Sequence, residues 1–397
     1  MAKVLFCWEL GGGYAYSEGQ AAGARVIAKA GHEVVLALHD LSHAQRLLGD
    51  KFRYYQAPVG APQQHLPNPM TFADVLINLG FGDADALAGR MRAWRNLFED
   101  VKPDIVRCTN APGALLAARG TRLRSVAIGL GSQVPPATSP LPILRSWAKN
   151  ADPTRIAARE RDLLSAMNRA LDTLGAPRLT SVGALYAEAD LRELYTYPEL
   201  DEYGPREGVK YVGSFQPGVG DAPVWPDVPG KRIFAYLQPF PAIGQALQGL
   251  AATGQPTLVY MPYATEELKR QYGGGTLRIT DKPLDLAKTV TLCDIGMDHG
   301  GHNIVASFLQ AGKPQLCIPS LFTEKVIAEK LVALGYGMTA RLEAAEIGAS
   351  LDRLLRDTAM AAKTRDYGAR IAHLDIRSIA RDTVASIDAV AALGPRH

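Results

Sequence analysis

The sequence predicts an α/β protein of two domains, each built on a parallel sheet that helices cover on both faces. Its 397 residues are enough for about two domains. Short apolar runs alternate with helical segments in both halves of the chain. A stretch rich in Pro and Gly at 214–226 divides the halves. We therefore expect two doubly wound domains that face each other across a cleft, with ligands at the carboxyl ends of the strands.

The first half contains the apolar runs of a parallel sheet. Strands are predicted at 4–10, 33–39, 52–57, 104–109 and 125–129. Helices are predicted at 19–30, 82–102 and 153–175. The third of these helices is rich in charge, which favours a solvated face over a binding surface.

The second half repeats this alternation after a linker at 216–230. Strands are predicted at 232–237, 257–261, 277–279, 291–297, 315–319 and 336–339, and helices at 241–252, 304–309, 323–335 and 376–392. The first domain is thus expected to span 1–215 and the second 231–375, with a final helical segment at 376–397.

Composition excludes several classes of protein. Hydrophobic residues make up 47% of the chain and charged residues 21%, which is ordinary for a soluble globular protein. The net charge of +3 gives no support for a nucleic-acid partner or a polybasic membrane patch. No apolar run is long enough for a transmembrane segment, and the apolar start meets Glu9 too early for a signal peptide. The four cysteines, which lie in predicted core strands and lack metal-ligand spacing, are expected to be buried thiols of a cytoplasmic enzyme: Cys7, Cys108, Cys293 and Cys317.

The most informative stretch is Asp298-His299-Gly300-Gly301-His302-Asn303, which joins a predicted strand to a predicted helix. The glycine pair lets backbone amides approach a ligand closely, and the helix N-terminus adds unpaired N–H groups and partial positive charge. Such a turn suits a phosphate group. His299 and His302 flank it and can donate hydrogen bonds to anionic oxygens. A glycine pair can also simply close a tight connection.

The match extends beyond the glycine pair. Gly312-Lys313-Pro314, Pro319, Glu324 and Ala328-Glu329 follow at spacings that resemble the donor-binding signature of family 1 nucleotide-sugar glycosyltransferases. The resemblance is to UDP-glycosyltransferases and macrolide glycosyltransferases, and it implies the GT-B fold of two Rossmann-like domains. In that family the last helix crosses back to the first domain. The resemblance implies the same for the predicted helix at 376–392.

The resemblance implies roles for the turn residues. His299 stands where the family has a histidine that touches the diphosphate, Gly301 where it has the signature glycine, and Asn303 where it has a phosphate-contacting Asn or Gly. Ile304 replaces the usual Ser or Thr, so one hydroxyl contact is missing. Ser307 stands near the acidic residue that binds the ribose in plant members, which puts a carboxylate clamp in doubt.

The sugar end of the signature also differs from the family. Thr323 and Glu324 stand at the Asp/Glu-Gln pair that holds sugar hydroxyls. Both also fit simple capping of the following helix, with Thr323 as the N-cap. The two interpretations are compatible, and a donor with fewer or differently placed hydroxyls is expected.

The N-terminal loop departs most from the family. The expected acceptor loop, Gly11-Gly12-Gly13, follows the first strand, but the family's Gly-His is replaced by Ala15-Tyr16. The partner aspartate of that histidine falls near Thr109, beside Asn110. With a pKa near ~10, a tyrosine is a poor general base at neutral pH.

Three explanations of the missing base remain open. Glu18 or Glu9 serves as the base, the acceptor is acidic enough to need little help, or the protein no longer transfers sugar. Glu18 also fits an ordinary helix-start carboxylate. Tyr16 fits a residue that orients the acceptor or donates a hydrogen bond.

The leading hypothesis is an inverting, metal-independent glycosyltransferase that moves a sugar from a UDP or dTDP sugar to a small-molecule or natural-product acceptor. The nucleotide sugar is a co-substrate, and no cofactor is expected. The alternatives are a sugar-nucleotide epimerase of the same fold and a retired sugar-nucleotide-binding auxiliary protein. The loops 68–72 and 132–136 are the candidate acceptor rim.

Overall fold

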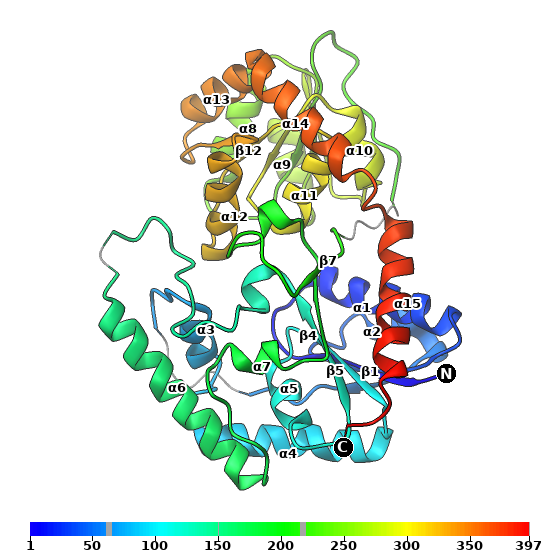
Figure 1. Ribbon diagram of the computed structural model, residues 1–397. Coiled ribbons are helices and arrows are strands. Elements are labelled where there is room, and N and C mark those ends of the chain that lie inside the picture. The colour runs from blue at the N-terminus through cyan, green and yellow to red at the C-terminus, as the bar shows by residue number, and fades with distance from the viewer. Residues whose placement is uncertain (61–65, 150, 215–219, 397) are drawn as a thin grey trace. The chain divides into compact units, whose positions relative to one another are not determined.

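The computed structural model describes residues 1–60, 66–149, 151–214 and 220–396. The chain divides into two compact units: Met1–Gly213 together with Arg377–His397, and Ser214–Ile376. Part of the predicted linker, 216–219, lies outside the described residues, and the rest of it belongs to the second unit. Both chain ends therefore belong to the first unit (Figure 1).

The first unit is built on a parallel sheet with the strand order β3-β2-β1-β4-β5-β6-β7 in its described part. Its strands are β1 (Lys3–Trp8), β2 (Glu33–Leu38), β3 (Arg53–Gln56), β4 (Ile105–Thr109), β5 (Arg124–Gly129), β6 (Leu191–Leu194) and β7 (Lys210–Tyr211). The order reverses between β1 and β4, which makes this the switch point of a doubly wound sheet. The first five strands match the prediction, whereas β6 and β7 were not predicted.

Helices cover both faces of this sheet (Figure 1). They are α1 (Tyr14–Lys29), α2 (Ala44–Leu48), α3 (Phe72–Asn78), α4 (Ala84–Val101), α5 (Pro112–Ala118), α6 (Pro153–Thr173), α7 (Ala184–Ala187) and α15 (Ile376–Ala392). The 3-10 turns are η1 (Gly49–Lys51), η2 (Gly131–Gln133) and η3 (Pro198–Leu200).

Strand β1 shows why both faces of the sheet are apolar. Alternate residues of a strand point to opposite faces, so Val4, Phe6 and Trp8 share one face. These three join the core that α1 and α15 complete with Ile27 and Ile387, among others. Burial on both faces gives β1 a continuous apolar run, which is the pattern that the sequence shows.

The second unit has a parallel sheet with the order β10-β9-β8-β11-β12-β13. Its strands are β8 (Ile233–Tyr236), β9 (Thr257–Tyr260), β10 (Leu277–Thr280), β11 (Ile295–Asp298), β12 (Gln315–Cys317) and β13 (Gly337–Thr339). Its helices are α8 (Ile243–Ala252), α9 (Glu266–Tyr272), α10 (Leu286–Leu292), α11 (His302–Gln310), α12 (Phe322–Ala333), α13 (Ala344–Arg356) and α14 (Thr358–Ile371). The predicted α/β class with two doubly wound sheets is confirmed.

Two apolar clusters flank this second sheet. Ile233 and Ala235 face the cluster that contains Leu247 of α8 and Leu351 of α13. Phe234 faces the opposite cluster, with residues of α10 and α11. The sheet is thus buried on both sides, and only its edges and strand ends offer polar groups to a ligand.

One predicted strand of the second unit was wrong in its first half. Thr291 and Leu292 belong to α10, and β11 starts only at Ile295. Cys293 is therefore the C-cap of α10, although all four cysteines are buried free thiols as predicted. A short apolar run is ambiguous between helix and strand, and here the Asp285 cap starts a helix in front of it.

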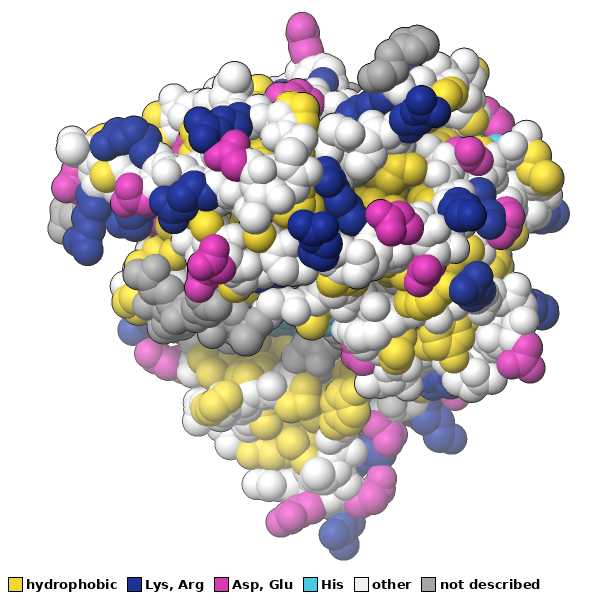
Figure 2. All heavy atoms as spheres, turned by 90° about the horizontal axis from the view of Figure 1, so that it is seen from below, with side chains coloured by type: hydrophobic (Ala, Val, Ile, Leu, Met, Phe, Trp, Pro, Cys, Tyr) yellow, Lys and Arg dark blue, Asp and Glu magenta, His cyan; other side chains and the backbone are white. Residues whose placement is uncertain are grey.

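The surface carries mixed charge. On the face drawn in Figure 2, basic and acidic side chains are interspersed, in agreement with the net charge of +3. Within the described ranges, no helix is both long and apolar enough to cross a bilayer.

A buried polar network holds α15 on the first sheet. The Tyr195 hydroxyl accepts a hydrogen bond from Arg107 Nη2 at 2.7 Å and lies 3.1 Å from Thr383 Oγ1 of α15. Lys210 Nζ donates to the Asp382 carbonyl and to Ser386 Oγ, both at 2.9 Å. These bonds fix one rotation of α15 about its axis, because apolar packing alone is not directional.

We predict that Tyr195→Phe lowers the free energy of unfolding by about 1–3 kcal/mol, because the buried Arg107 guanidinium loses an acceptor. Urea unfolding of the variant measures this loss. Tyr54→Phe is the matched control, since the Tyr54 hydroxyl donates only to the exposed Gln45 side chain at 3.1 Å. Equal losses in the two variants would show that the network adds nothing.

Candidate active site

The predicted phosphate turn joins β11 to α11 in the second unit. Helix α11 begins at His302 with Gly301 as its N-cap, and no side chain caps it. Its first backbone N–H groups are therefore not satisfied by a local side chain, which is the arrangement that binds an anionic oxygen. The His302 side chain is buried, and its Nδ1 lies 3.3 Å from the Asn303 amide oxygen. Asn303 is exposed.

The Asp298 side chain stabilises this turn through a hydrogen bond from the turn backbone. Its Oδ1 accepts a hydrogen bond from the Gly300 N–H at 2.6 Å, whereas its buried Oδ2 has no hydrogen-bond partner among the described residues. Burial raises the pKa of Asp298 to about 7, and the Gly300 hydrogen bond opposes that rise. The carboxyl group is thus poised between its neutral and charged forms near neutral pH.

Gly300 is required by geometry. Its φ of +83° lies in the left-handed region, and a Cβ there would lie 2.7 Å from the Glu324 carbonyl oxygen of α12. The turn therefore packs directly against the first turn of the next helix, which explains why a glycine precedes the N-cap.

His299 lies over the glycine turn. A Cβ on Gly301 would approach the His299 Nε2 to 2.9 Å, and the ring centroid lies 5.6 Å from that of Tyr236 at the end of β8. Burial lowers the pKa of His299, although the nearby Glu324 opposes the shift. A neutral imidazole has one N–H to donate, so His299 can act as a hydrogen-bond donor at neutral pH.

The structure changes the interpretation of Thr323 and Glu324. Leu321, not Thr323, is the N-cap of α12, and Glu324 is the third helical residue. Glu324 Oε2 accepts hydrogen bonds from the Ser320 N–H at 3.0 Å and the Leu321 N–H at 2.9 Å. Its Oε1 lies 3.7 Å from His299 Nε2. Glu324 therefore joins the helix start to the histidine, and Thr323, unlike Glu324, is exposed.

Tyrosines that sequence reasoning missed surround this edge of the sheet. Tyr236 and Tyr260 end neighbouring strands and stack with ring centroids 5.3 Å apart. Tyr263 is 84% exposed and has a φ of +70°, a strained value for a residue other than glycine. The signal was present, because each tyrosine lies at or just beyond the end of a predicted strand.

In the first unit, Tyr16 lies at the carboxyl edge of the sheet. It stacks on Trp8 with ring centroids 5.3 Å apart and planes 2° apart. Its hydroxyl accepts a hydrogen bond from Gln133 Nε2 at 2.7 Å. Burial raises the pKa of Tyr16, so the phenol stays protonated and is no general base. A Cβ on Gly11 would meet the Tyr16 ring at 2.8 Å, which accounts for one glycine of the exposed loop Gly11-Gly12-Gly13.

Glu9 is excluded as a catalytic base. Its side chain is fully buried, its Oε2 accepts a hydrogen bond from the Gly113 N–H at 2.6 Å, and Arg90 Nη1 lies 3.4 Å from its Oε1. Burial raises its pKa to about 7, while Arg90 and the Gly113 N–H oppose the rise. Glu9 points to the α4 and α5 face of the sheet, where both of its oxygens are engaged.

Glu18 points away from Tyr16. Two residues along a helix turn the side chain by about 200°. Tyr14, one turn before Glu18, packs edge-on against His43 at 5.2 Å, next to α2. Burial raises the pKa of Glu18, and the charges of Arg25 and Arg46 oppose this. Glu18 therefore belongs to the α1–α2 contact, and the prediction that it acts as base is not supported by its position.

A different carboxylate, Glu202, lies near Tyr16. It follows β6 and η3, which sequence reasoning did not detect as a strand end. Glu202 Oε2 accepts a hydrogen bond from the Ser132 N–H at 3.0 Å, and Glu202 Oε1 accepts one from Ser132 Oγ at 2.7 Å. Ser132 and Gln133 are part of the predicted rim 132–136. The other predicted rim, 68–72, instead caps α3: Thr71 and Asp74 form its capping box, and Phe72 is buried.

Comparison with known proteins finds relatives only at the level of structure. No protein-family model matches the sequence, and no curated protein matches it significantly. The structure is similar to the calicheamicin glycosyltransferase CalG4, with a TM-score of 0.71 and 17% identity over 98% of each chain. It is also similar to the glycosyltransferase VinC in complex with dTDP, with a TM-score of 0.67 and 14% identity over 99% of this chain and 100% of that one.

A third similar structure is the Streptomyces sp. SF2575 glycosyltransferase SsfS6 complexed with thymidine diphosphate. Its TM-score is 0.63, at 17% identity over 98% of this chain and 99% of that one. The chain has the GT-B fold. Identities this low establish a shared fold, and a GT-B chain's activity must be argued from its own residues.

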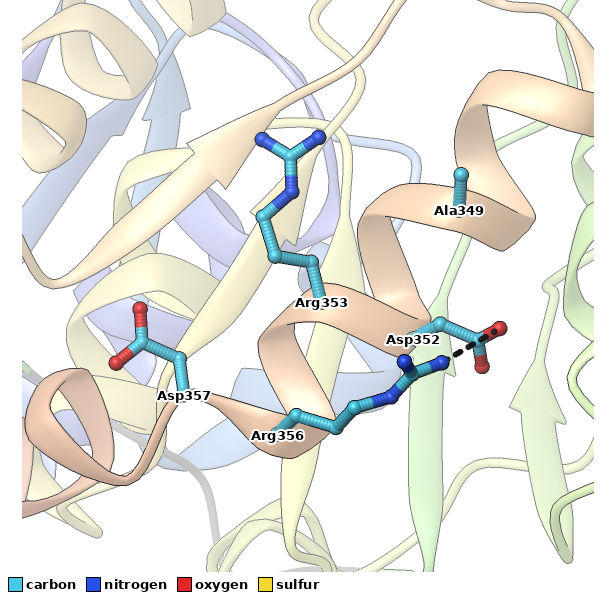
Figure 3. Close-up of a pocket in the computed structure, with 5 residues that line it drawn as sticks. All are labelled: Ala349, Asp352, Arg353, Arg356 and Asp357. Atoms are coloured by element: carbon cyan, nitrogen blue, oxygen red, sulfur yellow. Dashed lines mark ion pairs between the residues drawn. The ribbon is translucent and has the colours of Figure 1, made fainter.

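A surface hollow of about 570 Å³ lies elsewhere on the second unit (Figure 3). It is lined by Ala349, Asp352, Arg353, Arg356 and Asp357. Arg356 pairs with Asp352 at 3.5 Å, and Asp357 caps α14. These residues belong to α13 and its end, not to the carboxyl ends of the strands, so the hollow is not the GT-B ligand edge.

We predict that Asp298→Asn flattens the pH dependence of stability. The folded state holds the Asp298 proton more tightly than the unfolded chain, so this contribution is complete below the unfolded pKa of 3.8 and is lost as pH rises to about 7. The stability of the variant should gain on that of the wild type from about pH 4 to about pH 7, by about 1.4 kcal/mol per pH unit. Urea unfolding across this range measures it, with the exposed Asp366→Asn as control. Parallel curves would contradict the assignment.

Gly300→Ala should destabilise the protein by about 1–3 kcal/mol, because the added Cβ meets backbone at a positive φ. Gly89→Ala is the contrast, since a Cβ at that helical position of α4 meets nothing within 4 Å. It should instead stabilise by up to about 1 kcal/mol. Thermal unfolding of both variants distinguishes the two effects, and a harmless Gly300→Ala would show that the turn can relax.

Proposed function

We propose that this GT-B chain is a metal-independent glycosyltransferase that moves a sugar from a nucleoside-diphosphate sugar to a small-molecule acceptor, with inversion. The observation that carries the proposal is the β11–α11 turn, where His299 lies above an uncapped helix start. Backbone N–H groups and the helix dipole stabilise the charge that grows on a departing diphosphate. Because burial lowers its pKa, His299 is neutral near pH 7 and adds one N–H hydrogen-bond donor.

Thymidine diphosphate is the first nucleotide to test, since two similar structures hold it. UDP remains an equal chemical candidate, because the turn reads the diphosphate and not the base. In this proposal the acceptor hydroxyl displaces the nucleotide directly at the anomeric carbon. Thr323, exposed at the start of α12, is the proposed contact to the donor sugar. Glu324 has its Oε2 committed to the helix start and its Oε1 near His299.

We predict that dTDP or UDP raises the melting temperature of the protein, because a ligand that binds only the folded state stabilises it. His299→Ala should weaken binding about 10–100-fold, the loss of one hydrogen bond to a charged group. Calorimetric titration measures the affinity. His373→Ala is the control, because His373 is exposed on the same unit and its Nδ1 lies 3.0 Å from the Arg370 carbonyl.

Three results would overturn the proposal in different ways. No binding of any nucleotide would leave the turn with a structural role only. Tight binding with no sugar transfer to any acceptor or to water would identify a retired nucleotide-sugar-binding protein. Formation of an epimeric donor would instead identify an epimerase.

A further inference from the structure

The carboxyl edge of the first sheet carries a serine–carboxylate pair to which no role has been assigned above. Ser132 lies in η2, directly after β5, and Glu202 follows β6, the next strand in the sheet. The Ser132 hydroxyl donates to Glu202 Oε1 at 2.7 Å, and the Ser132 N–H donates to Oε2 at 3.0 Å. Both residues are half-buried, so part of each remains exposed.

The surrounding structure holds the pair in place. Asp201 is fully buried and accepts from Arg206 Nε and from the Tyr211 hydroxyl, both at 2.8 Å. Arg206 Nη2 also donates to the Gly131 carbonyl at 3.1 Å, which ties the Glu202 segment to η2. Arg206 thus pairs with Asp201, whereas Glu202 accepts its hydrogen bonds from Ser132.

Gly131 permits this close approach. A Cβ on Gly131 would lie 2.1 Å from Asp201 Oδ1 and 2.5 Å from Glu202 Oε2. Any larger residue would push the carboxylates away from η2. The glycine is therefore needed by the side chains that it faces.

Tyr16 completes the cluster from α1. Gln133, the residue after Ser132, donates to the Tyr16 hydroxyl at 2.7 Å. The Glu202 charge opposes ionisation of Tyr16, so the two groups lie within electrostatic reach. Asn110, at the end of β4, is buried with a φ of +43°, and its Oδ1 has no hydrogen-bond partner among the described residues. Strained and unsatisfied groups of this kind gather at functional sites.

Transfer of a sugar to a hydroxyl group needs a proton acceptor near that hydroxyl. Glu9 is buried against α5, and Glu18 lies near the charges of Arg25 and Arg46, so both carboxylates are engaged elsewhere. The pair at the ends of β5 and β6 is a carboxylate already hydrogen-bonded to a hydroxyl, the arrangement by which a base acts through a relay.

We propose that Ser132 and Glu202 are the base of the transfer reaction and that Tyr16 positions the acceptor. This inference rests on the proposed function. As the acceptor oxygen forms its bond to the anomeric carbon, the bond from that carbon to the diphosphate oxygen breaks, and the nucleotide leaves with the electron pair. The acceptor proton passes to Ser132 Oγ, and the Ser132 proton passes to Glu202.

The electrostatics of Glu202 suit this role. Burial raises its pKa above the usual carboxyl value, while its hydrogen bonds from Ser132 oppose the rise. A carboxylate with a raised pKa is a stronger base than an ordinary carboxylate. The titratable and charged groups that face it are Asp201, Tyr16, Tyr203 and the Arg206 that pairs with Asp201. Both tyrosines have raised pKa values, so they stay neutral while Glu202 titrates.

The test compares Glu202→Gln with wild type on three acceptors: water, 2-phenylethanol and 4-nitrophenol. The donor is dTDP-glucose or UDP-glucose, chosen by the nucleotide that binds, and released nucleoside diphosphate is the readout. Glu202→Gln should lower transfer to water and to the alcohol by about 10²–10⁴-fold. Transfer to 4-nitrophenol, largely ionised at mildly alkaline pH, should stay within about threefold, because an ionised acceptor needs no base.

Variants separate catalysis from folding. Ser132→Ala should repeat the selective loss, and Ser132→Thr, which keeps the hydroxyl, should recover most of the rate. Glu207→Gln, on the exposed part of the same segment, is the matched control with unchanged rates. For the alcohol, the wild-type rate should fall as pH drops through the Glu202 pKa, and in Glu202→Gln that step should vanish. Nucleotide affinity should be unchanged in all of them, since the turn lies in the other unit.

The possible outcomes distinguish failure of this inference from failure of the proposed function. Wild-type turnover that Glu202→Gln leaves intact on water and alcohol would overturn the inference and spare the proposed function. Equal losses on all three acceptors would make Glu202 a structural residue. A wild type that binds nucleotide but transfers sugar to none of the three acceptors would refute the proposed function and this inference with it.

Discussion

Every functional group described above depends on one constraint: in a parallel sheet, each strand must end at the same edge. Right-handed crossovers return the chain to the opposite edge before each new strand begins. Side chains from distant parts of the sequence therefore meet at the carboxyl ends. Ser132 and Glu202 meet because β5 and β6 are neighbours. Tyr236 reaches His299 in the same way, since β8 and β11 are neighbours.

The same constraint explains a feature that the two units share: a buried carboxylate at the end of the central strand. Each central strand ends in a buried carboxylate, Glu9 after β1 and Asp298 in β11, that accepts a glycine N–H at 2.6 Å. Burial raises the pKa of each to about 7. The difference is in the second oxygen. Arg90 lies beside Glu9, whereas Asp298 Oδ2 has no hydrogen-bond partner in the described chain.

The sequence predicts the parts of this fold that local chemistry controls. Apolar periodicity locates the central strands, and the Gly300-Gly301 pair locates the start of α11 to within two residues. Faces and partners are harder, because they are set by distant residues. Glu9 lies one position from Trp8 but points to the opposite face of the sheet, and Glu18 lies two positions from Tyr16 but points toward α2. Neither difference can be read from spacing without knowing which helix covers which face.

Glu202 shows the limit most clearly. Strand β6 has the sequence Leu-Arg-Glu-Leu, and its buried Glu193 breaks the apolar run that would have predicted a strand. Without that strand, the segment after it has no assigned edge, and Glu202 looks like any loop carboxylate. The prediction of Thr323 as the N-cap is wrong for a related reason. The Glu324 side chain accepts a hydrogen bond from the Leu321 N–H, so α12 starts at Phe322, one residue before Thr323. Side-chain reach, not propensity, decides that boundary.

The unpartnered Oδ2 of Asp298 bears on the proposed binding of a diphosphate at this turn. A diphosphate held by the first N–H groups of α11 would place negative charge near this carboxyl and favour its protonated form. Ligand binding and proton uptake at Asp298 are then coupled, and by linkage each strengthens the other. A charged aspartate would repel the nucleotide, but a neutral one still accepts the Gly300 hydrogen bond through Oδ1. Burial of Asp298 would thus allow one residue to shape the proposed diphosphate-binding turn without opposing the anion.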